Sequence, residues 1–188
     1  MTQDSAADGY RLITQIGFGP LGVVWAAEGA GGEVAVTVVA GTLAGVPETR
    51  EALRRAAATA AKFRHPNLAR SLGSRELYGE LLLIAELLQG ETLATRLARK
   101  PPLTEAEVAR LALALAEALA CLHQRGMVHG GISPENIFLT ADGMVKVMQV
   151  GAARVQSEAA LRLDIAEGLA PELGAGSREV TMASDIWA

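Results

Sequence analysis

Short apolar runs separated by glycine-rich turns make up the first third of the chain. Residues 10–16, 22–27 and 33–39 are rich in Ile, Val and other strand-forming residues, and a glycine-rich turn at 29–32 joins the second run to the third. Runs of this length between turn residues are typical of β-strands. The pattern therefore predicts an antiparallel meander of three strands.

The spacing becomes helical after this meander. Apolar positions recur at intervals of three and four between residues 47 and 63, and Pro66 prevents the helix from continuing. Two apolar runs follow at 68–77 and 81–88. They predict a hairpin that completes a five-stranded sheet accompanied by one helix.

The second half of the chain is mainly helical. Residues 91–99 predict a short helix, and Thr104 with Glu107 predicts a capping box at the start of a long amphipathic helix. Two short strands are predicted at 137–139 and 145–148. The apolar face of the long helix is predicted to consist of Val108, Leu111, Leu115, Leu119 and Leu122.

Composition and charge narrow the function classes. The 188 residues include 17 Lys and Arg against 21 Asp and Glu, and the resulting net charge of −4 gives no basic footprint for nucleic acid. With 50% hydrophobic residues, the chain is expected to fold as a globular domain. It has a single cysteine and no signal pattern, so we expect a cytoplasmic protein without direct membrane insertion.

Three glycines, Gly17, Gly19 and Gly22, precede Val24 in a G-x-G-x-x-G-x-V pattern. Such glycines let backbone amides approach a phosphate group without a Cβ in the way. Because they join two predicted strands, the pattern favours a phosphate-covering loop over the strand-to-helix turn of a dinucleotide-binding fold. A glycine-rich hairpin without a ligand fits this motif alone equally well.

Seven further segments occur in the order found in protein kinases. They match the third strand, the segment after the regulatory helix, the hinge, the catalytic loop, the metal-binding triplet, the end of the activation segment and the next buried helix. With these motifs the chain resembles a bacterial serine/threonine protein kinase domain from Tyr10 to its last residue. The segments are residues 34–37, 65–67, 85–88, 129–136, 149–151, 170–172 and 184–188.

The resemblance implies an α+β fold with two lobes. Residues 1–9 are expected to be a flexible N-terminus, and residues 10–88 an N-lobe with a five-stranded antiparallel sheet and one helix. Residues 89–188 are expected to form a mainly helical C-lobe. Because the chain stops at the start of the last matching helix, this lobe is expected to be truncated.

The chain departs from the kinase pattern at the positions that carry the chemistry. Phosphoryl transfer in the family uses a strand lysine, its helix glutamate, a catalytic aspartate with a nearby lysine, and a metal-binding aspartate. Asn136 is the one match to the family's metal-binding set. The other positions hold, in that order, Thr37, Ala56, Gly131, Ser133 and Gln149.

Neighbouring residues do not restore these groups. Glu51 matches the glutamate position only in a shifted register, and Glu135 lies in the catalytic loop where the family's side chain usually faces solvent. We therefore expect a pseudokinase that regulates or scaffolds a protein partner, such as an active kinase or another domain of the same polypeptide. The alternative is a divergent ATP-binding serine/threonine kinase or another nucleotide-dependent transferase.

Nucleotide binding is expected to be weak or absent. The resemblance places Val24, Ala35 and Phe138 around adenine, and Glu86 and Leu88 in the hinge that offers backbone hydrogen bonds. Without the lysine and the metal-binding aspartate, any ATP is expected to bind largely independently of magnesium. Apolar packing between the lobes explains Val24, Ala35 and Phe138 equally well.

The resemblance also assigns architectural roles. His129 is expected to be a buried structural imidazole, and Asp185 to hold the backbone of the catalytic loop. Glu172 is expected to lack the partner that family members supply further along the chain. Ser157 is the only serine or threonine between residues 151 and 170, and control by phosphorylation is not expected.

Overall fold

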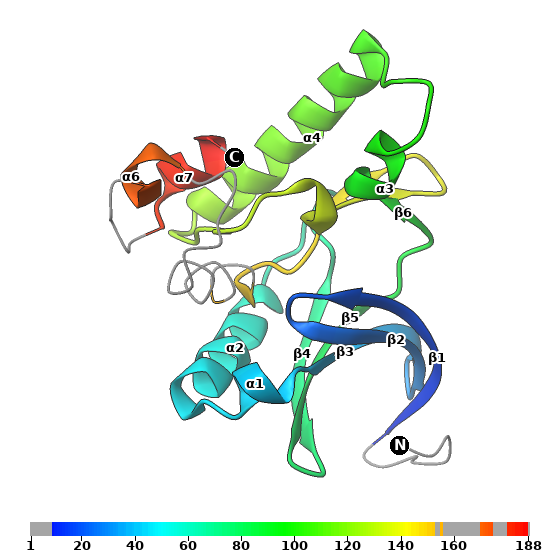
Figure 1. Ribbon diagram of the computed structural model, residues 1–188, viewed down its shortest axis with the longest axis vertical. Coiled ribbons are helices and arrows are strands. Elements are labelled where there is room, and N and C mark those ends of the chain that lie inside the picture. Colours follow the sequence, from blue (N-terminus) through cyan, green and yellow to red (C-terminus); the bar gives the residue numbers. More distant parts are fainter. Residues whose placement is uncertain (1–8, 153–154, 156–169, 175–179, 188) are drawn as a thin grey trace. The chain divides into compact units, whose positions relative to one another are not determined.

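The computed structural model describes residues 9–152, 155, 170–174 and 180–187 (Figure 1). The chain divides into two compact units. The first takes residues up to Lys62 together with Arg70–Leu88, and the second takes Phe63–Ala69 and the residues from Gln89 onward. The elements form an α+β fold, as predicted from the sequence, and the two units are described separately below.

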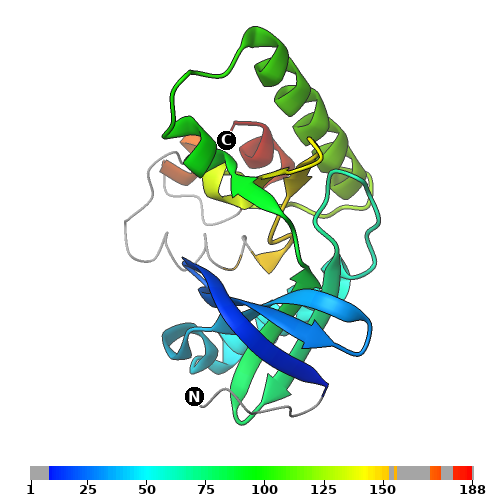
Figure 2. The ribbon, with the colours of Figure 1, turned by 90° about the vertical axis from the view of Figure 1, so that its right-hand side faces the viewer.

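The first unit is built on a five-stranded antiparallel sheet, as predicted. The strand order is β1-β2-β3-β5-β4, and Figure 2 shows the twist of these strands from the side. The strands are β1 (Tyr10–Gly19), β2 (Gly22–Gly29), β3 (Gly32–Val39), β4 (Ser71–Leu77) and β5 (Glu80–Glu86).

The two faces of this sheet differ in burial. One face carries a tightly packed core of Ala27, Val34, Val36, Leu82 and Ile84. Because side chains alternate along a strand, the residues between these point to the opposite face, where they are mostly half-buried. That second face holds the sheet residues that the sequence assigned to a nucleotide.

Two helices accompany the sheet. The short α1 (Gly41–Ala44) was not predicted, and α2 (Pro47–Ala60) begins with a proline, which suits the first helical turn. The helix ends at Ala60 rather than at residue 63 as predicted, because Phe63–Ala69 belongs to the second unit.

The second unit combines helices with a three-stranded sheet ordered β6-β7-β8. The predicted helix at 91–99 is wrong at its start, because Gly90–Thr92 pairs with β7 as strand β6, and the helix covers only Leu93–Leu97. The remaining elements are α4 (Glu105–His123), the 3-10 turn η1 (Pro134–Asn136), β7 (Ile137–Thr140), β8 (Val145–Val147), α6 (Pro171–Gly174) and α7 (Met182–Trp187), with Leu93–Leu97 as α3.

The segment Phe63–Ala69 docks on β8, which explains why the predicted strand at 68–77 begins only at Ser71. The Val147 amide donates to the Asn67 carbonyl and the Ala69 amide to the Val147 carbonyl, both at 2.8 Å. The Arg125 guanidinium stacks over the Phe63 ring at 5.2 Å from its centroid.

Helix α4 confirms the predicted capping box. The Thr104 hydroxyl accepts from the Glu107 amide at 3.3 Å, and the Glu107 carboxylate accepts from the Thr104 amide at 2.7 Å. These hydrogen bonds from Thr104 lower the pKa of Glu107. No helix in the described ranges is long and apolar enough to cross a membrane.

The predicted apolar face of α4 is correct except at its first turn. Val108 is 51% exposed, whereas Leu111, Leu119 and Leu122 are buried. Ala114 and Ala118 complete the buried face, because small residues let neighbouring backbone approach closely. The buried face of α4 therefore does not include Val108.

Two leucines on α4 provide a stability test. Leu122 is fully buried and Leu113 is 62% exposed. We expect Leu122→Ala to lower the free energy of unfolding by about 2–5 kcal/mol and Leu113→Ala by less than about 0.5 kcal/mol, measured by urea denaturation. Equal losses would contradict this orientation of α4.

Candidate functional site

The glycine-rich turn joins β1 to β2, as predicted. Gly22 is required by the fold, because a Cβ there would lie 2.0 Å from the Val38 carbonyl oxygen, and its φ is +145°. A Cβ at Gly17 would meet nothing closer than Val24 at 3.9 Å, and a Cβ at Gly19 would meet nothing within 4 Å. Packing in the described structure thus explains Gly22, whereas Gly17 and Gly19 leave open space beside the backbone.

The half-buried face of the first sheet gathers the residues assigned to adenine and phosphate. Val24 on β2 lies opposite Thr37 on β3, and Ala35 lies opposite Ala85 on β5. Partners in an antiparallel ladder point to the same side, so the three predicted residues share one face. Strands β2, β3 and β5 contain no lysine or arginine. Arg11 on β1 lies opposite Glu28 on this face, and its guanidinium donates to the Glu28 carboxylate at 2.6 Å.

In helix α2, Glu51, the alternative residue for the glutamate position, is paired within the helix. Glu51 accepts hydrogen bonds from Arg54 at 2.7 Å and from Arg55 at 2.6 Å, and these bonds lower its pKa to about 2. Its helical position is opposite to that of Leu53, which is buried. Ala56, half-buried, leaves the glutamate position without a charge.

The hinge residues lie at the end of β5. The Glu86 amide donates to the Arg70 carbonyl at 2.9 Å, and the Glu86 carboxylate accepts from the Arg70 amide at 2.9 Å. The Glu86 amide is therefore engaged within the first unit. Leu88 lies two residues beyond the strand and is half-buried.

A single buried carboxylate organises the loop that matches the catalytic loop. Asp185 on α7 is 3% exposed and accepts from the His129 amide at 2.8 Å and the Gly130 amide at 2.7 Å. The His123 Nε2 atom lies 2.8 Å from the same carboxylate. These contacts agree with the architectural role that the resemblance implies for Asp185.

His129 has the surroundings of a structural residue. Its ring is fully buried, with Nε2 at 2.8 Å from the Met148 carbonyl oxygen and Nδ1 without a hydrogen-bond partner among the described residues. Burial lowers the pKa of His129 below its usual 6.5, because the charged ring would lose its hydration.

The loop itself contains no acid at the catalytic position. Gly131 stands there, and its carbonyl accepts from the Asn136 Nδ2 atom at 2.8 Å. Ser133 precedes η1, and Glu135 is exposed within that turn. The Asn136 amide group, which the sequence left as the residual metal ligand, therefore serves to close the loop.

The position of the metal-binding aspartate holds Gln149 in a left-handed conformation, with φ +57°. Its Oε1 atom is buried and has no hydrogen-bond partner in the part of the chain that the structure describes. Gln149 and Asn136 provide neutral amides, whereas magnesium prefers carboxylate oxygens, so this donor set does not fit a kinase metal site. The described part of the chain also contains no group of three His, Cys, Asp or Glu residues suited to a metal ion.

Phe138 lies on β7, opposite Lys146 on β8 and Thr92 on β6. Its neighbours Ile137 and Leu139 point into the core formed with α4, so Phe138 occupies the other face of the small sheet. Its side chain is half-buried. The structure thus places Phe138 on the face of the small sheet that points away from the α4 core, beside Thr92 and Lys146.

Glu172 has a hydrogen-bond partner on α7, and this contact does not test the expected loss of the family's partner. It accepts a hydrogen bond from the Ser184 hydroxyl at 2.6 Å, which lowers its pKa. Thr181 exchanges backbone and side-chain hydrogen bonds with Ser184 at the start of α7. Ser157 lies outside the described residues.

The contact between His123 and Asp185 was not anticipated from the sequence. The chain has only three histidines, so His123 could have been considered as a partner for Asp185. The unpartnered Oε1 atom and positive φ of Gln149 had no such signal, because both depend on surroundings that form only on folding.

Comparisons with known proteins agree with this geometry. The family described as Protein kinase domain matches residues 10–188. Serine/threonine-protein kinase PknA of Mycobacterium tuberculosis is 32% identical over 190 aligned residues, covering 95% of this chain and 44% of that protein. Probable serine/threonine-protein kinase PknB of Corynebacterium glutamicum is 30% identical, covering 97% of this chain and 30% of that protein.

The solved structures include a similar fold. The M. tuberculosis PknI kinase domain has a TM-score of 0.80 and 26% identity, covering 98% of this chain and 70% of that chain. The chain spans less than half the length of the two kinases above.

Asp185 provides a test of the loop architecture. We expect Asp185→Asn to lower the free energy of unfolding by about 2–4 kcal/mol, because an amide nitrogen would face a backbone donor and the buried hydrogen bonds would be lost. The matched control is Glu172→Gln, which weakens one hydrogen bond and is expected to cost at most about 1 kcal/mol. Urea denaturation of both variants measures the difference.

His129 predicts a pH dependence of stability. Its folded pKa lies below its unfolded value, so the unfolded state binds the proton first as the pH falls below about 6.5. Stability conferred by neutral His129 is present above that pH and is lost as the pH decreases towards the folded pKa. We expect the difference in unfolding free energy between the wild type and His129→Asn to shrink from pH 7.5 to pH 5.5; a constant difference would contradict a buried neutral ring.

Proposed function

The chain belongs to the protein kinase domain family, and we propose that this domain is a pseudokinase that regulates or scaffolds a protein partner. The observation that carries the proposal is a fully formed loop without its chemistry. Asp185 holds the backbone of residues 129 and 130 in place, yet Gly131 provides no base. A role in binding would require the shape of the loop but not its acid.

The missing groups matter because each contributes strongly to the rate of phosphoryl transfer. A positioned general base contributes about 10²- to 10⁴-fold, and a metal ion contributes several kcal/mol of charge stabilisation. Thr37, Gly131 and Gln149 together remove the strand cation, the base and the metal carboxylate. Even with non-additive losses, the remaining chain lacks the parts that phosphoryl transfer requires.

The same arrangement supports weak, magnesium-independent nucleotide binding at most. The face with Val24, Ala35 and Thr37 is apolar or neutral, which suits adenine better than a triphosphate. The open space at Gly17 and Gly19 leaves only backbone amides to offset phosphate charge.

We infer that the shape of the loop at residues 129–136 serves to bind a protein partner. We place this partner among active kinases or further domains of the same polypeptide, and the single cysteine supports a cytoplasmic setting. The net charge of −4 argues against nucleic acid.

Transfer of phosphate from radiolabelled ATP tests the proposal. We expect the purified chain to transfer no label above background to itself or to a generic acceptor protein. Transfer that is abolished by Glu135→Gln would contradict the proposal, because it would identify a displaced base.

Thermal shift measurements test the nucleotide site separately. We expect the wild type to show the same small or absent shift with ATP plus magnesium and with ATP plus EDTA. The variant Thr37→Lys/Gln149→Asp is expected to gain a magnesium-dependent shift of several degrees, since ligand at 100 times its Kd stabilises by about 2.7 kcal/mol. Thr37→Leu/Gln149→Asn is the matched control without added charge.

A further inference from the structure

Helix α2 buries few apolar side chains. Its buried residues are one leucine and two alanines, Leu53, Ala57 and Ala60. Alanine buries little area, so this face contributes less than the leucine-rich face of α4. Thr37 and Ala56 also leave α2 without the lysine–glutamate pair to β3 that the kinase pattern would supply.

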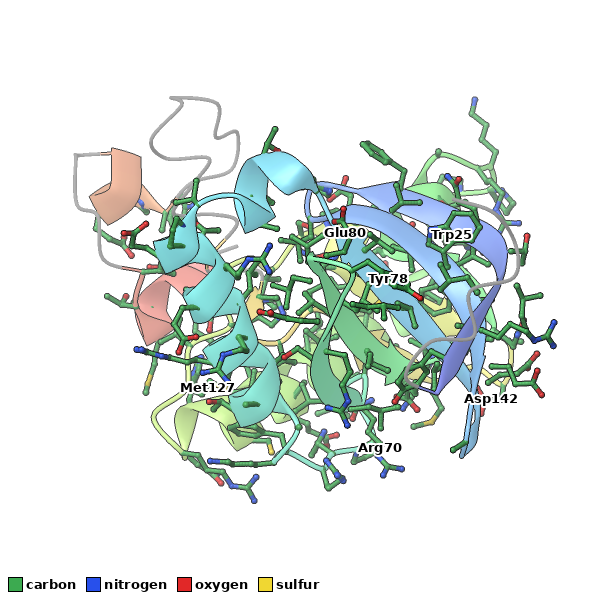
Figure 3. All side chains as sticks on the ribbon, turned by 90° about the horizontal axis from the view of Figure 1, so that it is seen from below. Trp25, Arg70, Tyr78, Glu80, Met127 and Asp142 are labelled. Carbon is green, nitrogen blue, oxygen red and sulfur yellow. The ribbon has the colours of Figure 1, made fainter. Side chains whose placement is uncertain are left out.

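Arg50, in the first turns of α2, contacts three other parts of the first unit. Its Nε atom donates to the Ala44 carbonyl at the end of α1 at 2.8 Å. Its Nη2 atom donates to the Gly79 carbonyl in the β4–β5 turn at 2.8 Å, and Nη1 lies 3.5 Å from the Glu76 carboxylate on β4. Tyr78 and Glu80 mark this turn in Figure 3. All three guanidinium nitrogens are thus used, which is the geometry that an arginine fork permits.

A second contact secures the other half of the helix. The Ser71 hydroxyl at the start of β4 donates to the Ala57 carbonyl at 3.3 Å. Helix α2 is therefore joined to the β4–β5 hairpin near both of its ends, and Arg50 supplies the charged and more extensive of the two contacts.

We propose that Arg50 anchors α2 on the sheet in place of a lysine–glutamate pair, so that α2 keeps one position whether or not nucleotide is bound. This inference goes beyond the proposed function, because it concerns the helix and does not depend on whether phosphate is transferred. A helix fixed by internal carbonyl groups presents an outer face whose form is independent of the nucleotide site.

The neighbouring arginines provide the matched control. Arg54 and Arg55 both donate hydrogen bonds to Glu51, which lies on the same helix, so these bonds join α2 to no other element. Such exposed pairs within one helix contribute little to stability. Arg54→Ala therefore removes an arginine of α2 without removing the proposed anchor.

Amide hydrogen exchange of the whole chain, followed by mass spectrometry, tests the anchor. We expect Arg50→Ala to accelerate exchange about tenfold or more in α2 and in the β4–β5 turn, since a hydrogen bond to a charged group is lost at two carbonyls. Exchange in α4 of the second unit is expected to be unchanged. Arg54→Ala is expected to accelerate α2 by less than about threefold. Equal acceleration by both variants would overturn the proposal.

Two further arms keep the test decisive if Arg50→Ala does not fold. Lysine keeps the charge but cannot make three contacts from one plane, so we expect Arg50→Lys to show most of the tenfold effect; wild-type exchange in this variant would overturn the three-way anchor. Adding ATP and magnesium to the wild type is expected to change α2 exchange by less than about twofold. Strong protection of α2 by nucleotide would overturn the proposal, even if no phosphate is transferred.

Discussion

The loop of the second unit depends on the hydrogen bonds to the buried carboxylate of Asp185. A buried carboxylate is costly unless hydrogen bonds surround it, and this one receives the His129 and Gly130 amides and lies against His123. The backbone of the loop is therefore fixed by a residue on α7, outside the loop itself. The loop's shape is thus set by side chains other than those at Gly131 and Gln149.

The sequence was informative wherever local rules determine structure. The capping box at Thr104 and the five-stranded sheet follow from short-range pattern and turn chemistry, and both are confirmed. The errors arose where tertiary pairing overrides local pattern. Gly90–Thr92 becomes a strand because β7 offers it a partner, and Phe63–Ala69 leaves the first unit because β8 does. Val108, which is exposed, shows that helical periodicity does not fix the edges of a buried helix face.

For the candidate site, the sequence predicted which chemical groups are present but not how they are used. That Thr37 and Gln149 carry no charge is a property of the residues themselves. That the Asn136 amide closes the loop onto the Gly131 carbonyl, and that Gln149 adopts a positive φ, depends on contacts between distant segments. The pairing of Glu51 with Arg54 and Arg55 likewise depends on contacts that form only once α2 is folded.

The three glycines of the β1–β2 turn are under different constraints. Gly22 is fixed by the Val38 carbonyl oxygen, which would lie 2.0 Å from any Cβ, whereas the space beside Gly17 and Gly19 is open. Over evolutionary time, Gly22 is therefore protected from drift by the sheet itself, irrespective of any nucleotide. A side chain at Gly17 or Gly19 would fill the open space where the resemblance places a phosphate, whereas a side chain at Gly22 would disturb the sheet whether or not a nucleotide binds.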